Sequence, residues 1–242
     1  MGVKPACKVW GSQTTLSASE AEKKGIENSF RYKNGKLIVD STKTAARTTT
    51  SINVKRPENA SAQGIDVSYH QGVINWEKVK NTGKVDFAII RCGYGMNEWN
   101  ETTQTWTQDD PQWEYNTSEC ERLNIPYGVY LYSYADTTEK AKSEAEHVIR
   151  MLEGKNLSYP IYYDMEDKSV MNNSKITAAK ASQIAQTFLN TMKAAGYNNL
   201  GVYSSKYYFE TKLTASVFNQ YPKWVAQYSN SCTYKKNYQI WQ

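Results

Sequence analysis

Short apolar runs separated by helix-forming stretches organise the chain from residue 64 onward. Two stretches, 138–152 and 176–195, repeat their apolar residues close to the 3.6-residue period of a helix. Gly196 supplies the stop signal of the second stretch. The apolar runs are rich in aromatic and β-branched residues and predict seven strands. These runs are 64–69, 87–92, 127–134, 159–165, 200–204, 224–228 and 238–242.

Strands that alternate with helices predict a parallel α/β sheet, and continuous apolar runs indicate strands buried on both faces. After the second run, the segment Cys92-Gly93-Tyr94-Gly95 lacks the spacing of a dinucleotide fingerprint or a phosphate-binding loop. We therefore expect an α/β barrel with its site at the C-terminal ends of the strands, rather than a nucleotide-binding sheet.

The first 63 residues have a different texture. Residues 43–63 are rich in Thr, Ala, Ser and Asn and show no apolar periodicity, which predicts a linker without a regular element. Before them, Asn34-Gly35 is typical of a hairpin turn that leads into residues 36–40. Residues 1–42 are too short to hold much core alone, so we expect a small N-terminal appendage of unknown role.

Charge is divided along the same boundary. Residues 1–63 hold 11 basic and 5 acidic side chains, whereas residues 64–242 hold 18 and 19. The net charge of +5 thus belongs to the N-terminal segment, which could contact an anionic wall or membrane surface, or simply be solvated. Since no dense arginine patch is present, we expect no nucleic-acid partner.

Cysteine and histidine usage argues against a metal site. No CxxC motif occurs. Neither of the two histidines, His70 and His147, stands at metal-ligand spacing from a cysteine. Disulfides are possible in an exported protein, but the spacing does not define the pairs. No run of 18 apolar residues predicts a membrane span. The N-terminus does not continue into a signal peptide, so we expect an exported form to have lost its leader.

Asp164 and Glu166 stand two residues apart at the end of a largely apolar run. On a strand they point the same way, roughly 7 Å apart along the chain. Carboxyl groups held close together cannot both ionise freely, so one tends to keep its proton and to serve as an acid. Hydrolysis of a glycosidic bond uses such a pair, although two solvated carboxylates would show the same spacing. Asp167 faces the other way, and we expect a surface or capping role.

Asp66 lies between Ile65 and Val67 in the first predicted strand. In a barrel it would point inward while its apolar neighbours point outward, and an inward carboxylate is best explained by a ligand or a hydrogen-bond partner. His70 and Gln71 could line the same rim, where a structural hydrogen bond is the simpler role for His70.

Taken together, these runs resemble glycoside hydrolase family 25, the Chalaropsis-type lysozymes. The resemblance covers residues 64–242 in order and leaves out residues 1–63. The matching runs are GIDVSYHQG (64–72), INW (74–76), FAIIR (87–91), GYG (93–95), IPYGVY (125–130), YSY (132–134), YPIYYDME (159–166), GVYS (201–204), WVAQY (224–228) and IWQ (240–242).

The resemblance implies a modified TIM-like β/α barrel with few, short helices that hydrolyses the β-1,4 bond between N-acetylmuramic acid and N-acetylglucosamine. By position, Glu166 would be the general acid/base. Asp164 would stabilise the substrate's 2-acetamido group as an internal nucleophile, with retention of configuration. Asp66 would be a third acidic group of the cleft. The residues expected to line the sugar subsites are Tyr132, Tyr134, Tyr203, Trp224 and Gln227.

The resemblance also implies bacterial peptidoglycan as the partner, no cofactor or metal, and a monomer that is secreted or associated with the cell wall. One departure concerns the end of the sequence. The family normally continues past the IWQ run through a Val-Asp-x-Asn element, whereas this sequence stops at Gln242. We expect either a truncation or a replacement segment, for which residues 36–40 are a candidate. The alternatives are a catalytically impaired glycan-binding barrel and a chitinase-like hydrolase.

Overall fold

The computed structural model describes residues 7–9, 32–33, 36–37 and 59–242. Its strands are β1 (Cys7–Val9), β2 (Tyr32–Lys33), β3 (Lys36–Leu37), β4 (Gln63–Val67), β5 (Phe87–Tyr94), β6 (Trp99–Asn100), β7 (Thr105–Trp106), β8 (Tyr127–Tyr132), β9 (Ile161–Asp164), β10 (Leu200–Ser205), β11 (Lys223–Ala226) and β12 (Ile240–Trp241). Its α-helices are α2 (Trp76–Asn81), α3 (Trp113–Arg122), α4 (Thr138–Met151), α5 (Lys168–Met171), α6 (Ala178–Ala194) and α7 (Lys206–Thr211), and its 3-10 helices are η1 (Tyr69–Gln71) and η2 (Ser216–Gln220).

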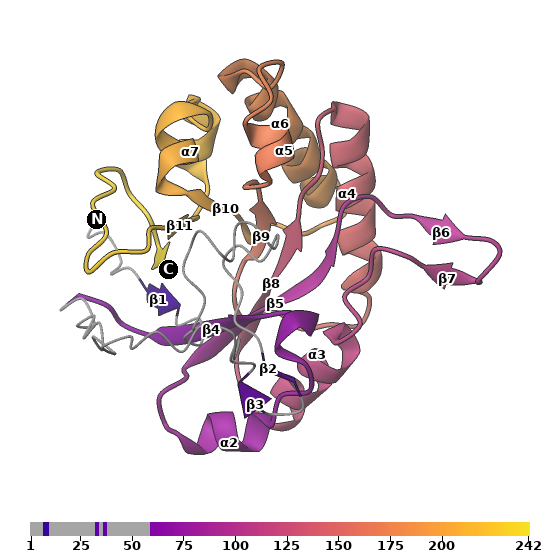
Figure 1. The fold of residues 1–242 in the computed structure, drawn as a ribbon, viewed down its shortest axis with the longest axis vertical. Coiled ribbons are helices and arrows are strands. Elements are labelled where there is room, and N and C mark those ends of the chain that lie inside the picture. The colour runs from indigo at the N-terminus through magenta and orange to yellow at the C-terminus, as the bar shows by residue number, and fades with distance from the viewer. Residues whose placement is uncertain (1–6, 10–31, 34–35, 38–58) are drawn as a thin grey trace, which may run out of the picture.

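Eight parallel strands form one curved sheet in the order β1-β12-β11-β10-β9-β8-β5-β4 (Figure 1). Each of the seven predicted runs overlaps one of these strands. The eighth, β1, pairs with β12 on one side and with β4 on the other, so the strand order returns to its start. The expectation of an α/β fold with a parallel sheet and few helices is confirmed.

Closure by β1 corrects the prediction for residues 36–40. Lys36–Leu37 does not enter the barrel but pairs antiparallel with Tyr32–Lys33, as the Asn34-Gly35 turn signal predicts for a local hairpin. Neighbouring segments joined by a two-residue turn pair antiparallel, whereas a barrel strand here needs parallel partners. The place between β12 and β4 is filled by Cys7–Val9 instead.

The predicted N-terminal boundaries also change at two points. Residues 1–42 contribute β1 to the barrel, so this segment is not wholly an appendage. Gln63, predicted to end the linker, opens β4 and lies opposite Lys8. Residues 59–62 contain no helix or strand, and the rest of the predicted linker, residues 43–58, lies outside the described residues.

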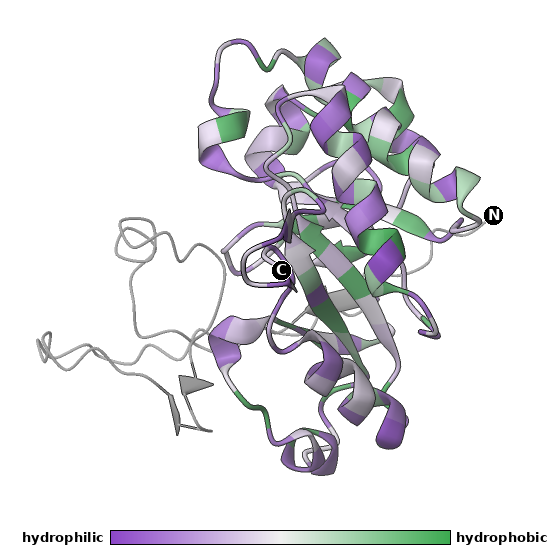
Figure 2. Ribbon diagram, turned by 90° about the vertical axis from the view of Figure 1, so that its right-hand side faces the viewer, coloured by the Kyte–Doolittle hydropathy of each residue, from purple (hydrophilic) through white to green (hydrophobic). Residues whose placement is uncertain are grey.

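The sheet separates two apolar cores. Along β5 the side chains alternate: Phe87 and Ile89 join a small cluster inside the barrel, while Ala88 and Ile90 join the large core beneath the helices. Figure 2 shows the hydrophobic residues concentrated on the central strands. Gly201 makes room inside, because a Cβ there would lie 2.5 Å from the ring of Tyr162.

The two helices predicted from periodicity, α4 and α6, pack on each other and on the sheet. Each begins at a threonine whose hydroxyl accepts a backbone N–H, Thr137 for α4 and Thr177 for α6. Phe188 of α6 stacks on Tyr163 of β9, with ring centroids 3.9 Å apart. This contact fixes the strand that carries Asp164.

Candidate functional site

Three acidic side chains converge at the carboxyl ends of the barrel strands. Asp66 lies on β4, Asp164 is the last residue of β9, and Glu166 follows two residues later. Asp164 and Glu166 are only 2% and 7% exposed, so they are not two solvated carboxylates at a strand end. Sequence spacing predicted this pair, and the barrel adds Asp66 from a strand almost 100 residues away.

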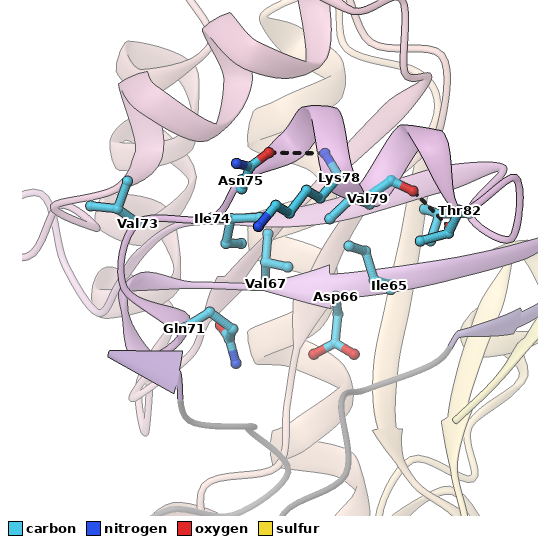
Figure 3. Close-up of a pocket in the computed structure, with 11 residues that line it drawn as sticks. Ile65, Asp66, Val67, Gln71, Val73, Ile74, Asn75, Lys78, Val79 and Thr82 are labelled. Atoms are coloured by element: carbon cyan, nitrogen blue, oxygen red, sulfur yellow. Dashed lines mark hydrogen bonds between the residues drawn. The ribbon is translucent and has the colours of Figure 1, made fainter. Parts of the chain in front are cut away.

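Asp66 points away from its apolar neighbours, as predicted. Figure 3 shows Ile65 and Val67 on one side of β4, toward α2, and the Asp66 carboxylate on the other. The cavity of about 340 Å³ between β4 and α2 is therefore on the outer side of the strand, apart from the three carboxyl groups. Burial raises the pKa of Asp66 to about 7, against a backbone hydrogen bond that lowers it.

The pKa of Asp164 lies well above its ordinary value. Burial is the largest cause, and the charge of Glu166 adds to it, while the Arg91 guanidinium opposes the rise. Asp164 Oδ1 is buried and has no hydrogen-bond partner among the described residues. A buried carboxyl oxygen without a donor is costly, so it fits a site where a ligand supplies the missing hydrogen bond.

Arg91, buried on β5, is the cation of the site. Its Nε donates to Asp110 Oδ2 at 2.8 Å, and Asp110 also accepts the backbone N–H of Tyr69 at 2.9 Å. The guanidinium lies over the rings of Tyr69 and Tyr94, 4.9 and 5.5 Å from their centroids. Its Nη2 has no hydrogen-bond partner within the described part of the chain. No role was predicted for Arg91 from the sequence, although a cation within an apolar strand is a signal of function.

Gln242 is a second residue of the site for which the sequence predicted no role. Its Nε2 donates to Asp66 Oδ2 at 2.9 Å, joining β4 to the residue that follows β12. Its own Oε1 is buried and accepts no hydrogen bond from any described residue. The amide thus holds the Asp66 carboxyl in place from across the barrel.

Two of the predicted sugar-binding residues lie inside the barrel. Tyr203 and Trp224 are almost fully buried, with ring centroids 4.4 Å apart, and both belong to the inner apolar cluster. Trp224 Nε1 is buried without a hydrogen-bond acceptor among the described residues. Tyr130 of β8, which was not predicted, meets Trp224 edge-on at 5.9 Å.

The other three predicted sugar-binding residues lie nearer the surface. The Tyr132 and Tyr134 rings lie 5.1 Å apart, and Tyr134 is 44% exposed. The Gln227 amide donates to Thr233 Oγ1 and accepts the Thr233 N–H, at 3.0 and 2.8 Å. Gln227 therefore braces its own loop, and its role in a subsite stays a prediction.

Local capping explains the polar residues at the rim. Gln71 Oε1 accepts the backbone N–H of Ser68 at 2.7 Å, while Ser68 Oγ accepts the N–H of His70 at 3.3 Å, a reciprocal cap at the start of η1. Asp167 caps α5 by accepting the N–H of Val170 at 3.1 Å, which confirms its predicted capping role.

A buried carboxyl on α4 holds the ends of β8 and β9 together. Glu144 accepts hydrogen bonds from Ser133 Oγ at 2.7 Å, Tyr163 OH at 2.5 Å and the Tyr134 N–H at 2.8 Å. Burial raises the pKa of Glu144 to about 6, although these three donors lower it. The network connects the residue before Asp164 to Tyr134, two residues past the end of β8.

Within the described residues, no group of three or more His, Cys, Asp and Glu side chains could hold a metal ion. Cys92, Cys120 and Cys232 are free thiols in this part of the chain. None of its helices has the length and hydropathy needed to cross a membrane. The site brings together three carboxyl groups, one buried guanidinium and an aromatic surround. Such a set can supply acid/base chemistry to a glycosidic bond.

Comparisons with known proteins agree with this geometry. The family model described as "Glycosyl hydrolases family 25" matches residues 65–242. Among solved structures, the modular autolysin LytC of Streptococcus pneumoniae is 36% identical with a TM-score of 0.62, over 73% of this chain and 41% of that chain. A family 25 glycosyl hydrolase of Bacillus anthracis shares the fold at 16% identity and a TM-score of 0.64, over 78% and 81% of the two chains.

One curated relative is the uncharacterized protein YegX of Escherichia coli K12. It is 24% identical over 186 residues, which make up 75% of this chain and 62% of YegX. The chain thus spans less than two thirds of the length of YegX and of LytC.

Proposed function

Because this chain belongs to glycosyl hydrolase family 25, we propose that it is a lysozyme that cleaves the β-1,4 bond between N-acetylmuramic acid and N-acetylglucosamine in peptidoglycan. The observation that carries the proposal is the buried pair Asp164 and Glu166, with Asp66 on β4 of the same barrel. In support, LytC has been solved in complex with a synthetic peptidoglycan ligand, and it is 34% identical to this chain in that structure.

Glu166 would be the general acid and base. It would protonate the leaving oxygen of the scissile bond and later take a proton from the attacking water. Its near-complete burial supports this role, because a reacting group in a site shielded from water acts on the bound substrate rather than on solvent.

Asp164 would act on the substrate's 2-acetamido group rather than on the sugar carbon. Its unpartnered Oδ1 is an acceptor for the amide N–H, and this hydrogen bond would strengthen as the acetamido oxygen attacks and positive charge develops. This substrate-assisted route predicts retention of configuration, and the separation of the carboxyl groups does not test it.

Arg91 and the aromatic residues would complete the cleft. The guanidinium keeps Asp164 closer to its ionised form, which a group stabilising positive charge requires. The exposed face of Tyr134, with Tyr132 and the deeper Tyr203 and Trp224, offers flat surfaces on which sugar rings stack. We further propose that the protein acts as a monomer at the cell wall, outside the cytoplasm, without a cofactor.

The proposal is tested by digesting purified peptidoglycan with this chain and identifying the products by mass spectrometry. A lysozyme releases fragments whose reducing end is N-acetylmuramic acid. Fragments ending in N-acetylglucosamine, or cleavage of chitin oligosaccharides in preference to peptidoglycan, would contradict the muramidase assignment. A glycan-binding barrel would retain wall fragments on pull-down and release nothing.

A further inference from the structure

The β6–β7 hairpin, which follows β5 and precedes α3 in the chain, projects from the barrel beside α4 (Figure 1). Trp99 and Trp106 face each other across its two strands, with ring centroids 5.2 Å apart and ring planes at 64°. Trp99 is 40% exposed. Tryptophan combines a large flat apolar ring with a polar N–H, and for this reason it is enriched at interfaces with ligands and partners.

Side chains of α4 anchor the hairpin and position its two tryptophans. Arg150 of α4 lies over Trp106 at 4.0 Å from the ring centroid. The same guanidinium donates to Asp109 at 3.0 Å and to Asn97 at 2.9 Å, and these two residues flank the hairpin. Buried His147 contacts Asp109 Oδ1 at 2.8 Å. Because two-stranded hairpins are marginally stable alone, this anchor is what orders the Trp99 face.

The base of the hairpin is continuous with the candidate site. The backbone N–H of Tyr94 donates to Gln108 of the hairpin base at 3.0 Å, and the next N–H, that of Gly95, donates to the Tyr132 carbonyl at 2.9 Å. The Tyr94 ring meets Tyr134 edge-on at 6.4 Å. The hairpin thus extends the aromatic rim that begins at Tyr132 and Tyr134.

The composition of the hairpin narrows the class of ligand. Residues 96–108 contain Glu98 and Glu101 and no lysine or arginine. Two negative charges disfavour an anionic partner, such as an acidic lipid surface or an anionic wall polymer. The other polar side chains at the tip are Asn, Thr and Gln, which donate to and accept from hydroxyl groups. A flat ring with such neighbours fits an uncharged pyranose.

We propose that the β6–β7 hairpin is an accessory glycan-binding arm on which Trp99 stacks against an uncharged N-acetylhexosamine ring of the polymer, beyond the two sugars being cleaved. The identity of the glycan rests on the proposed function. The arm increases the residence of the enzyme on long strands and adds nothing for fragments too short to reach it.

The test compares Trp99→Ala with Tyr207→Ala, which removes an exposed aromatic side chain from α7, across the molecule (Figure 1). Both changes are made in a Glu166→Gln background, and binding to teichoic-acid-free insoluble peptidoglycan is measured by co-sedimentation. Trp99→Ala is expected to weaken binding about five-fold, the loss of one stacking contact, while Tyr207→Ala stays within two-fold. Trp99→Phe should recover most of the affinity and Trp99→Leu should not, since leucine is apolar but lacks a flat ring.

Kinetics with Glu166 intact provide the second measurement: the loss caused by Trp99→Ala on polymer should exceed its loss on a tetrasaccharide. Equal binding by the Trp99→Ala and parent proteins overturns the proposal. Full recovery of binding with Trp99→Leu also overturns it. So does an equal loss of binding to anionic vesicles by Trp99→Ala, or sedimentation in which the parent protein is a dimer and the Trp99→Ala protein a monomer. Because binding is read without turnover, failure of this arm is distinct from absence of muramidase activity.

Discussion

At the scale of single residues, the barrel buries polar groups that water would otherwise surround. Four polar atoms of the barrel are buried and have no hydrogen-bond partner among the described residues. They are Asp164 Oδ1, Arg91 Nη2, Trp224 Nε1 and Gln242 Oε1. Each such atom costs free energy, on the order of 1–3 kcal/mol. All four belong to barrel strands or to the residue that follows β12, where a bound substrate would complete their hydrogen bonding.

Replacement of Glu166 by glutamine should lower the rate of wall lysis by about 100-fold or more, because an amide cannot protonate the leaving oxygen. The fold should persist, as measured by circular dichroism. The matched control is Glu146→Gln, an exposed change on α4, which should leave lysis unchanged. Retention of more than about a tenth of the parent rate by Glu166→Gln would exclude the assigned role.

Replacement of Asp164 by asparagine should reduce kcat about 100-fold while KM changes little, roughly three-fold or less. The reason is that asparagine preserves the shape but loses the charge that stabilises the transition state. Steady-state kinetics on soluble glycan fragments separate the two parameters. A variant that binds poorly yet turns over at the parent rate would contradict the argument.

Replacement of Arg91 by methionine should shift the acidic limb of the pH–rate profile to higher pH. Arg91 lowers the pKa of Asp164, whereas burial and the charges of Glu166, Asp66 and Asp167 raise it. Without the cation that pKa rises, so a higher pH is needed to ionise Asp164. Activity at pH 5 relative to pH 7 should fall about three-fold or more.

Two further variants control this experiment. Arg91→Lys keeps the charge and should keep the limb near its original pH. Arg122→Met removes an exposed arginine that pairs with Glu119 on α3, and it should leave the profile unchanged. An unmoved limb in a folded Arg91→Met protein would show that another group governs the profile.

At the scale of elements, the decisive feature is β1. Its three residues come from the N-terminal segment. They complete the sheet because β1 pairs with β12 on one side and with β4 on the other. Such closure removes two exposed strand edges, each a row of unpaired backbone groups. It also brings the Gln242 amide to the Asp66 carboxyl, because β1 holds β12 on one side and β4 on the other.

Replacement of Lys8 by proline should destabilise the barrel, since proline cannot donate to the ladder and fixes its backbone angle. We expect a loss of about 2 kcal/mol and a decrease in Tm of roughly 4–8 °C by differential scanning calorimetry. Lys8→Ala keeps the backbone donor and should leave the Tm nearly unchanged. Equal melting of the two variants would mean that β1 adds nothing to the stability of the barrel.

At the scale of the whole molecule, catalysis should require no metal ion. Among the described residues no His, Cys, Asp and Glu cluster could hold one, and the carboxyl groups with the substrate's acetamido group supply both proton transfer and a nucleophile. Prolonged EDTA treatment should leave the rate of wall lysis within about 20% of the untreated rate. Loss of activity that one specific metal restores would overturn the proposed mechanism.

The sequence by itself determined seven of the eight barrel strands, the two long helices and the acidic pair. A strand repeats every two residues, so Asp164 and Glu166 share a direction, and Ile65, Asp66 and Val67 alternate, wherever the strands lie. Apolar runs mark burial on both faces, and threonines mark the starts of α4 and α6. These are local rules: the strands, the two helices and the alternation of Ile65, Asp66 and Val67 are confirmed in the described residues, while the shared direction of Asp164 and Glu166 stays a prediction.

Only the tertiary structure decided which distant residues meet. Local pattern gave no sign that Cys7–Val9 rather than residues 36–40 would close the barrel, because a three-residue strand is specified by the edges it pairs with. Nor did it show that Arg91 and Gln242 face the acidic groups, or that Gln227 braces its loop. Local pattern did not predict the short β6–β7 hairpin, because its order comes from Arg150 and His147. These residues contact Asp109 at the hairpin base from 41 and 38 residues further along the chain. Contacts of this kind depend on closure of the whole barrel, which no local period encodes.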